Sequence, residues 1–196
     1  IGATFREVEI QNGEAWSART LRSFQTNYGR KPFFHEVMPM VEEWLSDNGG
    51  KNLGDLDEKF IVAACRKMGI VPKFHHSSRF PSRERRSRRV EEILRQVNAR
   101  VYHSAFGSFS YMRDDGVFPL PDIETVFLDY QPIPYPQKGF EGFVPRLSVL
   151  DAFFNIGFAA TKLLIMKGTR WMTWSERSML DHDSTAMEVD DCPFTV

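Results

Sequence analysis

The chain has 196 residues, which suits one main domain and leaves little room for a second independent core. Hydrophobic residues make up 42% and charged residues 26%, so the composition excludes a wholly disordered, collagen-like or coiled-coil chain. The formal net charge is -1, so no global field recruits nucleic acid or an anionic membrane. A charge-driven partner must therefore use a local patch.

The compartment follows from the cysteines and from the apolar stretches. Two cysteines are too few for a disulfide scaffold and no signal peptide is visible, so a reducing cytoplasm is the expected location. The longest mostly apolar stretch, residues 147–166, is interrupted by polar residues such as Asp151 and Lys162, so no membrane span is expected. The chain begins with Ile1 rather than Met, which fits a fragment of a longer protein.

Helical periodicity dominates the first third of the chain. Alternating apolar residues predict a short strand over residues 5–10. Amphipathic helices are expected over residues 14–28, from Pro32 to the Asn48-Gly49-Gly50 stop, and over residues 55–68. In the third helix, Asp55 and Glu58 have the spacing of a capping box.

Strands and helices alternate in the middle of the chain. Strands are predicted at residues 70–75, 100–103 and 123–130, with a helix at 84–98 and a helical turn at 108–112. This alternation indicates an α/β fold, a layered domain with a mixed, partly parallel sheet flanked by helices.

The last third begins with a stretch rich in proline. Residues 132–145 carry four prolines and should form an ordered extended loop. Ser148 and Asp151 then have the spacing of an acidic capping box for a helix that runs to Asn155 or a little beyond. We expect the domain to cover residues 1–168, followed by a tail over 169–196 that is mobile from about residue 180. Trp171 and Trp174 should pack back on the domain.

Two pairs of neighbouring residues at predicted strand ends could carry chemistry. His75 and His76 cannot both chelate one metal in regular strand geometry, and the chain lacks H-x-x-x-H and C-x-x-C spacing, so no metal site is expected. His103 and Ser104 could form a Ser/His pair for acyl transfer. They could equally be ordinary surface and core residues, because no G-x-S-x-G motif accompanies them.

Six arginines crowd the junction between a polar loop and the following helix, opposed only by Glu84. They are Arg79, Arg83, Arg85, Arg86, Arg88 and Arg89. Because guanidinium groups pair with phosphates, the cluster could hold a nucleotide-sugar, a pyrophosphate or an RNA backbone; the alternative is a solvated helix face. Neither G-x-G-x-x-G nor G-x-x-x-x-G-K-[ST] occurs, so no cofactor is predicted.

Polar residues also gather around the proline-rich loop. They are Tyr130, Tyr135 and Gln137, with Asp151 and Asn155 one turn apart on the following helix. A helix N-terminus favours anions, and a stiff loop above it would form one wall of a pocket. Alternatively, the tyrosine hydroxyls anchor the loop and Asp151 caps the helix.

The strongest motif lies in this region. Tyr135-Pro136-Gln137, followed by Phe143-Val144-Pro145 and Leu147-Ser148-Val149-Leu150-Asp151-Ala152-Phe153-Phe154-Asn155-Ile156-Gly157, closely resembles the C-terminal signature of the WbqC-like protein family. Matching order extends over residues 5–164. The family usually opens with a His-Gln-Pro-Asn-Tyr motif that does not precede Ile1, and its Tyr-Leu-Ser-Gly turn appears here as Tyr102-His103-Ser104-Ala105.

The resemblance implies a bacterial-type role in making surface polysaccharides, with N-acylation of an amino sugar as the reaction. We therefore expect a cytoplasmic transferase that adds an acyl or aminoacyl group, such as glycyl, to a nucleotide-linked amino sugar. Asp151 or His103 would be the base, and Asn155 and Gln137 would orient groups or stabilise the oxyanion. The expected substrate-binding residues are Arg79, Arg83, Arg86, Tyr130, Tyr135 and Ser104.

Two alternatives stay open. One is a non-catalytic binding or scaffold module of the same pathway. The other is RNA or aminoacyl-tRNA binding through the arginine cluster. The expected partner is a nucleotide-sugar or another small molecule rather than nucleic acid.

Overall fold

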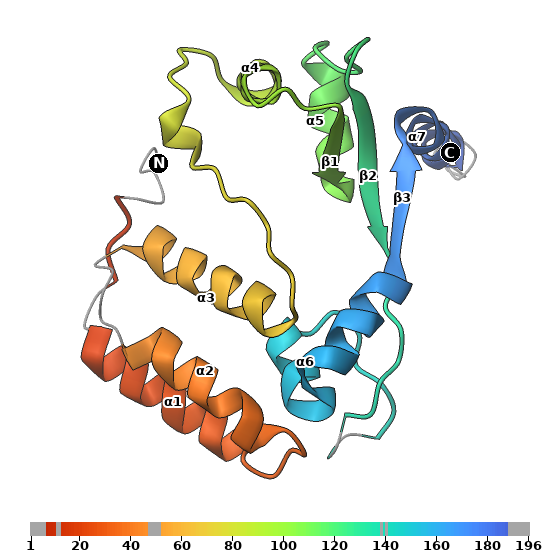
Figure 1. Cartoon of the computed structure of the whole chain (residues 1–196). Coiled ribbons are helices and arrows are strands. Elements are labelled where there is room, and N and C mark those ends of the chain that lie inside the picture. Colours follow the sequence, from red (N-terminus) through yellow and green to blue (C-terminus); the bar gives the residue numbers. More distant parts are fainter. Residues whose placement is uncertain (1–6, 11–12, 47–51, 138, 140, 188–196) are drawn as a thin grey trace, which may run out of the picture. The chain divides into compact units, whose positions relative to one another are not determined.

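The computed structural model describes residues 7–10, 13–46, 52–137, 139 and 141–187 (Figure 1). The chain divides into two compact units. Unit 1 comprises residues 1–73 and 132–167, and unit 2 comprises residues 74–131 and 168–196. Each unit is therefore assembled from two separate stretches of the chain.

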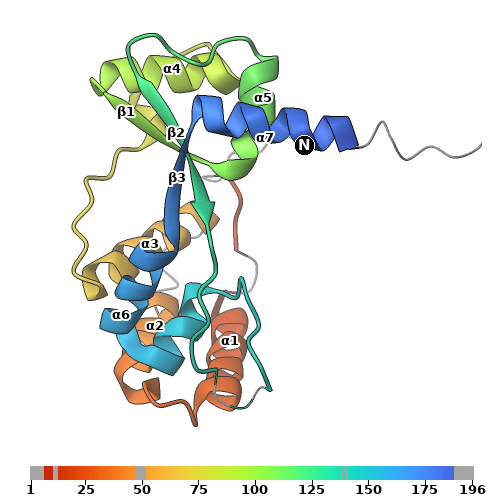
Figure 2. The ribbon, with the colours of Figure 1, turned by 90° about the vertical axis from the view of Figure 1, so that its right-hand side faces the viewer.

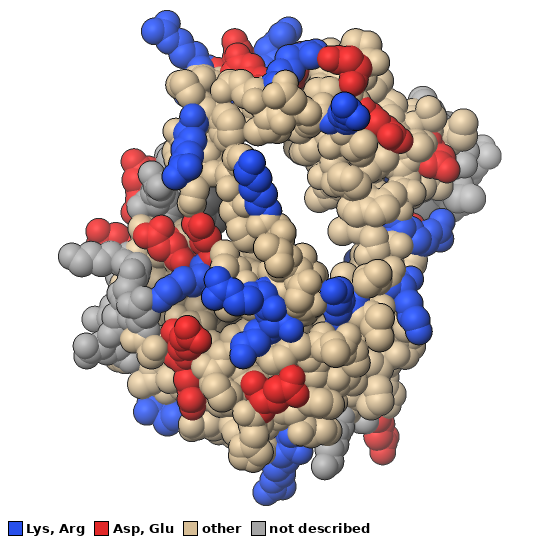
Figure 3. Space-filling view, in the orientation of Figure 1, with Lys and Arg blue, Asp and Glu red and all other residues tan. Residues whose placement is uncertain are grey.

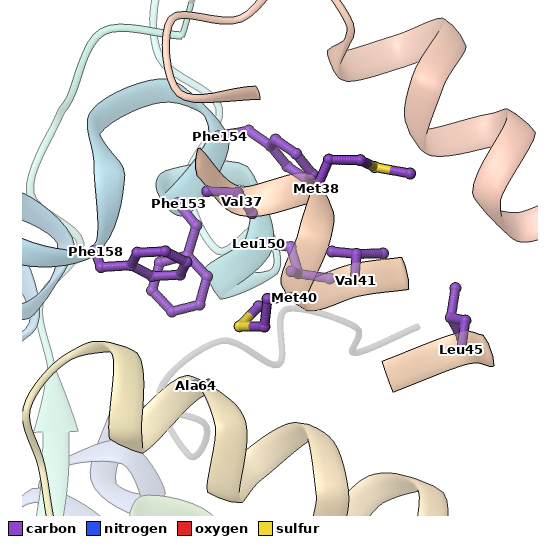
Figure 4. Packing of buried hydrophobic residues seen from close by; sticks show 10 residues of the cluster. All are labelled: Val37, Met38, Met40, Val41, Leu45, Ala64, Leu150, Phe153, Phe154 and Phe158. Carbon is purple, nitrogen blue, oxygen red and sulfur yellow. The ribbon is translucent and has the colours of Figure 1, made fainter. Parts of the chain in front are cut away.

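Unit 1 is helical. It contains α1 (Gly13–Tyr28), α2 (Phe34–Ser46), α3 (Leu53–Lys67) and nearly all of α6 (Val149–Gly168). The apolar face of α2 packs against the first half of α6, and Figure 4 shows Val37 and Val41 beside Leu150 and Phe154. The Trp44 indole N–H donates to the Leu56 carbonyl at 3.0 Å, which ties α2 to α3.

The helix α6 is bent at Gly157, whose φ of 75° and ψ of 173° are open to glycine and strained for other residues. A Cβ added there would lie 2.8 Å from the Phe33 ring, so this ring also requires glycine. The bend interrupts the i to i+4 ladder, and the Phe33 amide donates to the Phe154 carbonyl at 3.1 Å. Phe33 therefore fills the bend with both its ring and its amide.

Among the described helices, α6 is the one long and apolar enough to cross a membrane by length and composition. Half of that stretch is buried inside the protein. A core helix passes the same test, and Asp151 and Asn155 are buried in the first half of α6. These contacts identify the first half of α6 as a core element of unit 1.

Two helix starts show how side chains cap the backbone. The predicted cap of α3 at Asp55 is wrong, because Asn52 is the N-cap and its Oδ1 accepts from the Asp55 amide at 2.9 Å. Asn52 also donates from Nδ2 to the Asp55 carboxylate at 2.9 Å, so Asp55 occupies the third position of the helix. At α6, Ser148 Oγ accepts from the Leu150 amide at 3.3 Å.

Unit 2 contains a three-stranded sheet in the order β1-β2-β3 (Figure 2). Strand β1 (Val101–Ala105) runs parallel to β2 (Glu124–Tyr130), and β3 (Thr169–Thr173) runs antiparallel to β2. The mixed, partly parallel sheet confirms the expected α/β fold class.

Helices accompany the sheet of unit 2. They are α4 (Arg86–Gln96), α5 (Phe109–Asp114) and α7 (Trp174–Met187), with short 3-10 turns at Ser77–Arg79 and Phe106–Ser108. The Trp174 ring lies 4.9 Å from the Phe109 ring and 5.8 Å from the Phe127 ring, centroid to centroid. The expectation that Trp174 packs on the domain is confirmed, and this contact fixes the beginning of α7 against the core.

The predicted strands and the strands of the structure differ at several points. The predicted strand over residues 70–75 is wrong, because this segment has no strand pairing; Pro72 lacks a backbone donor and Val71 is 95% exposed. Strand β3 was not predicted, although it pairs with β2 along five residues. Of the predicted strand over residues 5–10, only 7–10 are described, and Glu9 forms an isolated bridge with Asn52.

Candidate functional site

A buried carboxylate lies at the centre of a polar cluster in unit 1. Asp151, in the first turn of α6, is 2% exposed. Its Oδ2 accepts from the Tyr135 hydroxyl at 2.7 Å and from Gln137 Nε2 at 3.3 Å, and Tyr28 makes a further hydrogen bond to the carboxylate. These donors replace the water that burial removes from the charge. We call Tyr28, Tyr135, Gln137, Asp151 and Asn155 the Asp151 cluster.

Gln137 holds the proline-rich loop to this carboxylate. Its Oε1 accepts from the Val144 amide at 2.8 Å, and its Nε2 donates to the Val144 carbonyl at 2.9 Å. The Tyr135 ring packs edge-on against Phe143, with centroids 5.4 Å apart. Both Nε2 hydrogens of Gln137 are therefore used inside the protein, which leaves no donor for an oxyanion and makes Gln137 a positioning residue in this geometry.

The two tyrosines respond to the buried charge. Burial, together with the negative charge and hydrogen bond of Asp151, raises the pKa of Tyr28 to about 12. Burial and the hydrogen bond to Asp151 likewise raise the pKa of Tyr135 to about 12, and the neighbouring Gln137 amide acts in the opposite direction. Both hydroxyls are therefore neutral donors at neutral pH.

Tyr28 was not among the predicted site residues. It is the last residue of α1, and its ring stacks on Phe154 at 4.5 Å between centroids. Tyr28 and Asp151 are more than a hundred residues apart in the sequence, so helical spacing could not predict that they lie close together. The signal available was that Tyr28 lies within residues 5–164, which match the family pattern in order.

Asn155 braces the same turn of α6. It is buried, and its Nδ2 donates to the Asp151 backbone carbonyl at 2.9 Å. Asn155 therefore supports the backbone that carries Asp151. The structure brings together four of the predicted residues, Tyr135, Gln137, Asp151 and Asn155.

The other predicted residues belong to unit 2. His103 and Ser104 are neighbours on β1 and so face opposite sides of the sheet. The exposed His103 ring lies 4.4 Å from the Trp171 ring, whereas buried Ser104 Oγ is 2.6 Å from Ser108 Oγ. The hydrogen bonds of Ser104 thus stay within its own buried cluster, which does not include His103. Tyr130 ends β2, and its ring would lie 2.7 Å from a Cβ added at Gly168.

The predicted phosphate-binding arginines differ in their engagement. Arg79 and Arg83 are exposed, whereas Arg86 Nε lies 3.0 Å from the Asp115 carboxylate. Ser87 Oγ also donates to Asp115 at 2.7 Å. The Ser87 hydroxyl, with help from Arg86, holds the pKa of Asp115 below its usual range. Arg86 is therefore already partnered, which leaves Arg79 and Arg83 as the freer candidates.

In the described part of the chain, metal-ligating side chains do not cluster, and a hollow lies outside the Asp151 cluster. Within the described ranges, no three His, Cys, Asp or Glu side chains gather as metal ligands would. One hollow on unit 1 lies between α2 and α3 and is lined by residues that include Glu43, Lys59 and Arg66. Its charges are mixed, and none of its lining residues belongs to the Asp151 cluster.

One unit is helical and buries a carboxylate under an ordered loop, and the other contains a small mixed sheet. The chain passes between them three times, so the protein is a two-unit α/β protein. Comparison with known families gives its identity: the chain belongs to the WbqC-like protein family, whose sequence profile matches residues 2–163. The resemblance noted in the sequence is thus confirmed.

The similar protein found among curated sequences does not define an activity. The chain is 26% identical over 153 residues to the uncharacterized protein Rv1507c of Mycobacterium tuberculosis strain H37Rv. The match covers 78% of this chain and 66% of that relative, so the chain spans just under two thirds of the curated protein it matches. No solved structure matches the chain significantly.

Proposed function

We propose that the chain is part of a cytoplasmic transferase that adds a small acyl or aminoacyl group, such as glycyl, to a nucleotide-linked amino sugar during surface-polysaccharide biosynthesis. Family membership supports the pathway. The observation that carries the chemistry is the buried Asp151 carboxylate, held by Tyr135, Tyr28 and Gln137 next to an ordered loop. A buried acid with precise donors is typical of a site that moves a proton.

The reaction requires a base. The sugar ammonium must lose a proton before its nitrogen attacks the acyl carbonyl, after which the acyl–donor bond breaks. Asp151 is almost fully buried, so the half-buried Tyr135 would be the group that meets the substrate. As the ammonium proton passes to the Tyr135 oxygen, the Tyr135 proton passes to Asp151 Oδ2 across the 2.7 Å hydrogen bond. Asp151 is then the proton acceptor and Tyr135 the relay.

The nucleotide diphosphate requires cations. Unit 2, taken by itself, offers two exposed arginines, Arg79 and Arg83, whose paired N–H donors suit a phosphate. Arg86 contributes less in this proposal, because Asp115 already binds it. The activated acyl donor is a second substrate, and the proposal needs no bound cofactor.

A non-catalytic binding module is the second candidate. It is favoured by the same cluster, because every donor to Asp151 comes from the protein itself and Gln137 has no free Nε2 hydrogen. In that reading the cluster anchors the proline-rich loop and the protein binds the nucleotide-sugar without changing it.

Mass spectrometry of the full-length protein with nucleotide-linked amino sugars and acyl donors separates these candidates. The transferase predicts a sugar product whose mass has increased by the acyl group, formed about a hundredfold or more slowly by Asp151→Asn and Tyr135→Phe. Asp57→Asn, an exposed carboxylate on α3, is the control and should leave the rate unchanged. Sugar binding without product would favour the binding module, and unchanged rates in both variants would reject Asp151 as the base.

A further inference from the structure

The second half of α6 presents an apolar face to solvent. Beyond the bend at Gly157, Leu163 is 57% exposed and Met166 is 63% exposed, and Ala159 lies one turn before Leu163 on the same side. The first half of the same helix is the buried core of unit 1. Neighbouring exposed apolar residues on a helix are a mark of an interaction surface.

A second exposed apolar segment follows directly on a contact with this half-helix. The Lys67 Nζ at the end of α3 is 5.9 Å from the centroid of the Phe158 ring, and Lys162 Nζ lies 3.9 Å from the position of a Cβ added at Gly69. The end of α3 therefore lies against α6 at residues 67–69. The next two residues of the chain, Ile70 and Val71, are both exposed.

The charge of this surface is one-sided. Residues 67–75 and 159–167 contain no Asp or Glu, whereas they contain Lys67, Lys73, Lys162 and Lys167. Figure 3 shows Lys and Arg side chains gathered over the end of α3 and over α6. The whole chain has a net charge of -1, so this positive surface is a local feature. We call it the α6 face: Ile70, Val71, Leu163 and Met166, with the four lysines.

We propose that unit 1 docks through the α6 face on an anionic lipid bilayer, as a peripheral and reversible contact. Exposed Leu and Met would enter the boundary between headgroups and acyl chains, and the lysines would meet the lipid phosphates. Residues 158–168 form a helix about 16 Å long, about half of a bilayer's hydrocarbon thickness, so this segment lies on the membrane and does not span it. The inference concerns where the protein works and does not depend on the proposed reaction.

The composition of the face favours lipid over other occupants. A second copy of the chain in a two-fold contact would set these cations against one another, which costs binding energy. Nucleic acid would use the cations but gains nothing from exposed Leu163 and Met166, which offer no ring for base stacking. An anionic bilayer is the partner that uses both the apolar residues and the lysines.

Co-sedimentation with lipid vesicles tests the proposal on the whole chain. We expect binding to phosphatidylcholine vesicles that contain phosphatidylglycerol, weakened by salt, and little binding to phosphatidylcholine alone. Lys162→Gln and Lys167→Gln should each lower the affinity about fivefold, and Leu163→Gln about tenfold or more. Ile61→Gln on α3, where Ile61 is 49% exposed and lies outside the face, should bind like the unmodified chain.

Three results would overturn the proposal. The first is equal binding to both kinds of vesicle, and the second is wild-type binding by Leu163→Gln. The third is self-association in sedimentation velocity without vesicles that Leu163→Gln abolishes, because the face would then be occupied by a second copy. Leu163 and Ile61 are both exposed, so circular dichroism should show both variants folded.

Discussion

The Tyr135 hydroxyl donates to Asp151 Oδ2 at 2.7 Å, across sixteen residues of sequence. This bond joins an irregular, proline-rich segment to the first turn of α6. Gln137 repeats the connection two residues later, so the loop is held to the helix at two points. Replacing the Asp151 carboxylate would therefore remove a buried negative charge and also the group that anchors the proline-rich loop to α6.

Replacement of the carboxylate by an amide should weaken unit 1. Asp151→Asn keeps the shape but removes the charge that accepts from Tyr135 and Gln137, and charge-assisted hydrogen bonds contribute about 1.5–3 kcal/mol each. We expect a loss of about 2 kcal/mol in the free energy of unfolding, measured in urea. In a double-mutant cycle with Tyr135→Phe the two losses should not add, because both remove one bond.

The control for this cycle is Asp57→Asn, which should change the free energy of unfolding by less than about 0.5 kcal/mol. Additive losses for Asp151→Asn and Tyr135→Phe would contradict a direct interaction between the two side chains.

Alkaline pH should weaken the same cluster. The folded-state pKa values of Tyr28 and Tyr135 are about 12, above the usual value of 10.0, so the folded state retains these protons longer than the unfolded state. Their contribution is complete below pH 10 and is lost as the pH rises toward 12. The free energy of unfolding should therefore fall between pH 10 and 12.

Tyrosinate absorbance checks this directly. Tyr28→Phe and Tyr135→Phe should each remove signal from the late part of the titration. Ionisation of all tyrosines near pH 10 in the folded protein would show that the cluster does not hold their protons.

The bend of α6 should tolerate only glycine. In Gly157→Ala, the new Cβ would meet the Phe33 ring at 2.8 Å, and alanine would be strained at a φ of 75°. Strain of this kind costs about 1–3 kcal/mol, and the clash adds to it, so we expect about 2 kcal/mol or more of destabilisation in urea. Gly107→Ala, where nothing lies within 4 Å, should change stability little. Equal effects of the two substitutions would contradict the bend.

Low pH should weaken the interaction of the Asp115 carboxylate with Ser87 and Arg86 at the start of α4. The pKa of Asp115 lies below its usual value of 3.8, chiefly through Ser87, so the folded state favours the carboxylate. This contribution is complete above the usual value and is lost as the pH falls through the lower folded-state pKa. Ser87→Ala should raise the Asp115 pKa toward 3.8, as followed by NMR of the carboxyl carbon.

Arg95→Gln provides the comparison for the acid experiment. Arg95 holds the pKa of Asp122 below its usual value, so this variant should shift Asp122 and leave Asp115 unchanged. An Asp115 titration that is the same in Ser87→Ala and the unmodified chain would remove Ser87 from the explanation.

The sequence by itself determined the local elements and the family. Apolar spacing located α1, α2 and α3, β-branched and aromatic residues located β2, and the motif from Leu147 to Gly157 identified the WbqC-like family. These features depend on residues that are close in sequence, and the physical preferences that create them act over one or two turns or along one strand. The N-cap at Asn52 was missed because Asp55, three residues later, has a similar capping propensity.

The tertiary structure decided which distant residues share an environment. Strand β3 forms because it pairs with the free edge of β2, and no pattern of apolar residues within 169–173 could predict that pairing. Tyr28 lies close to Asp151 only when α1 packs on α6. The side chains of His103 and Ser104 point away from each other because neighbouring residues of a strand face opposite sides of the sheet. Hydrogen bonds between elements depend on how helices and loops pack, and packing is a property of the whole chain, which is why these relationships required the three-dimensional structure.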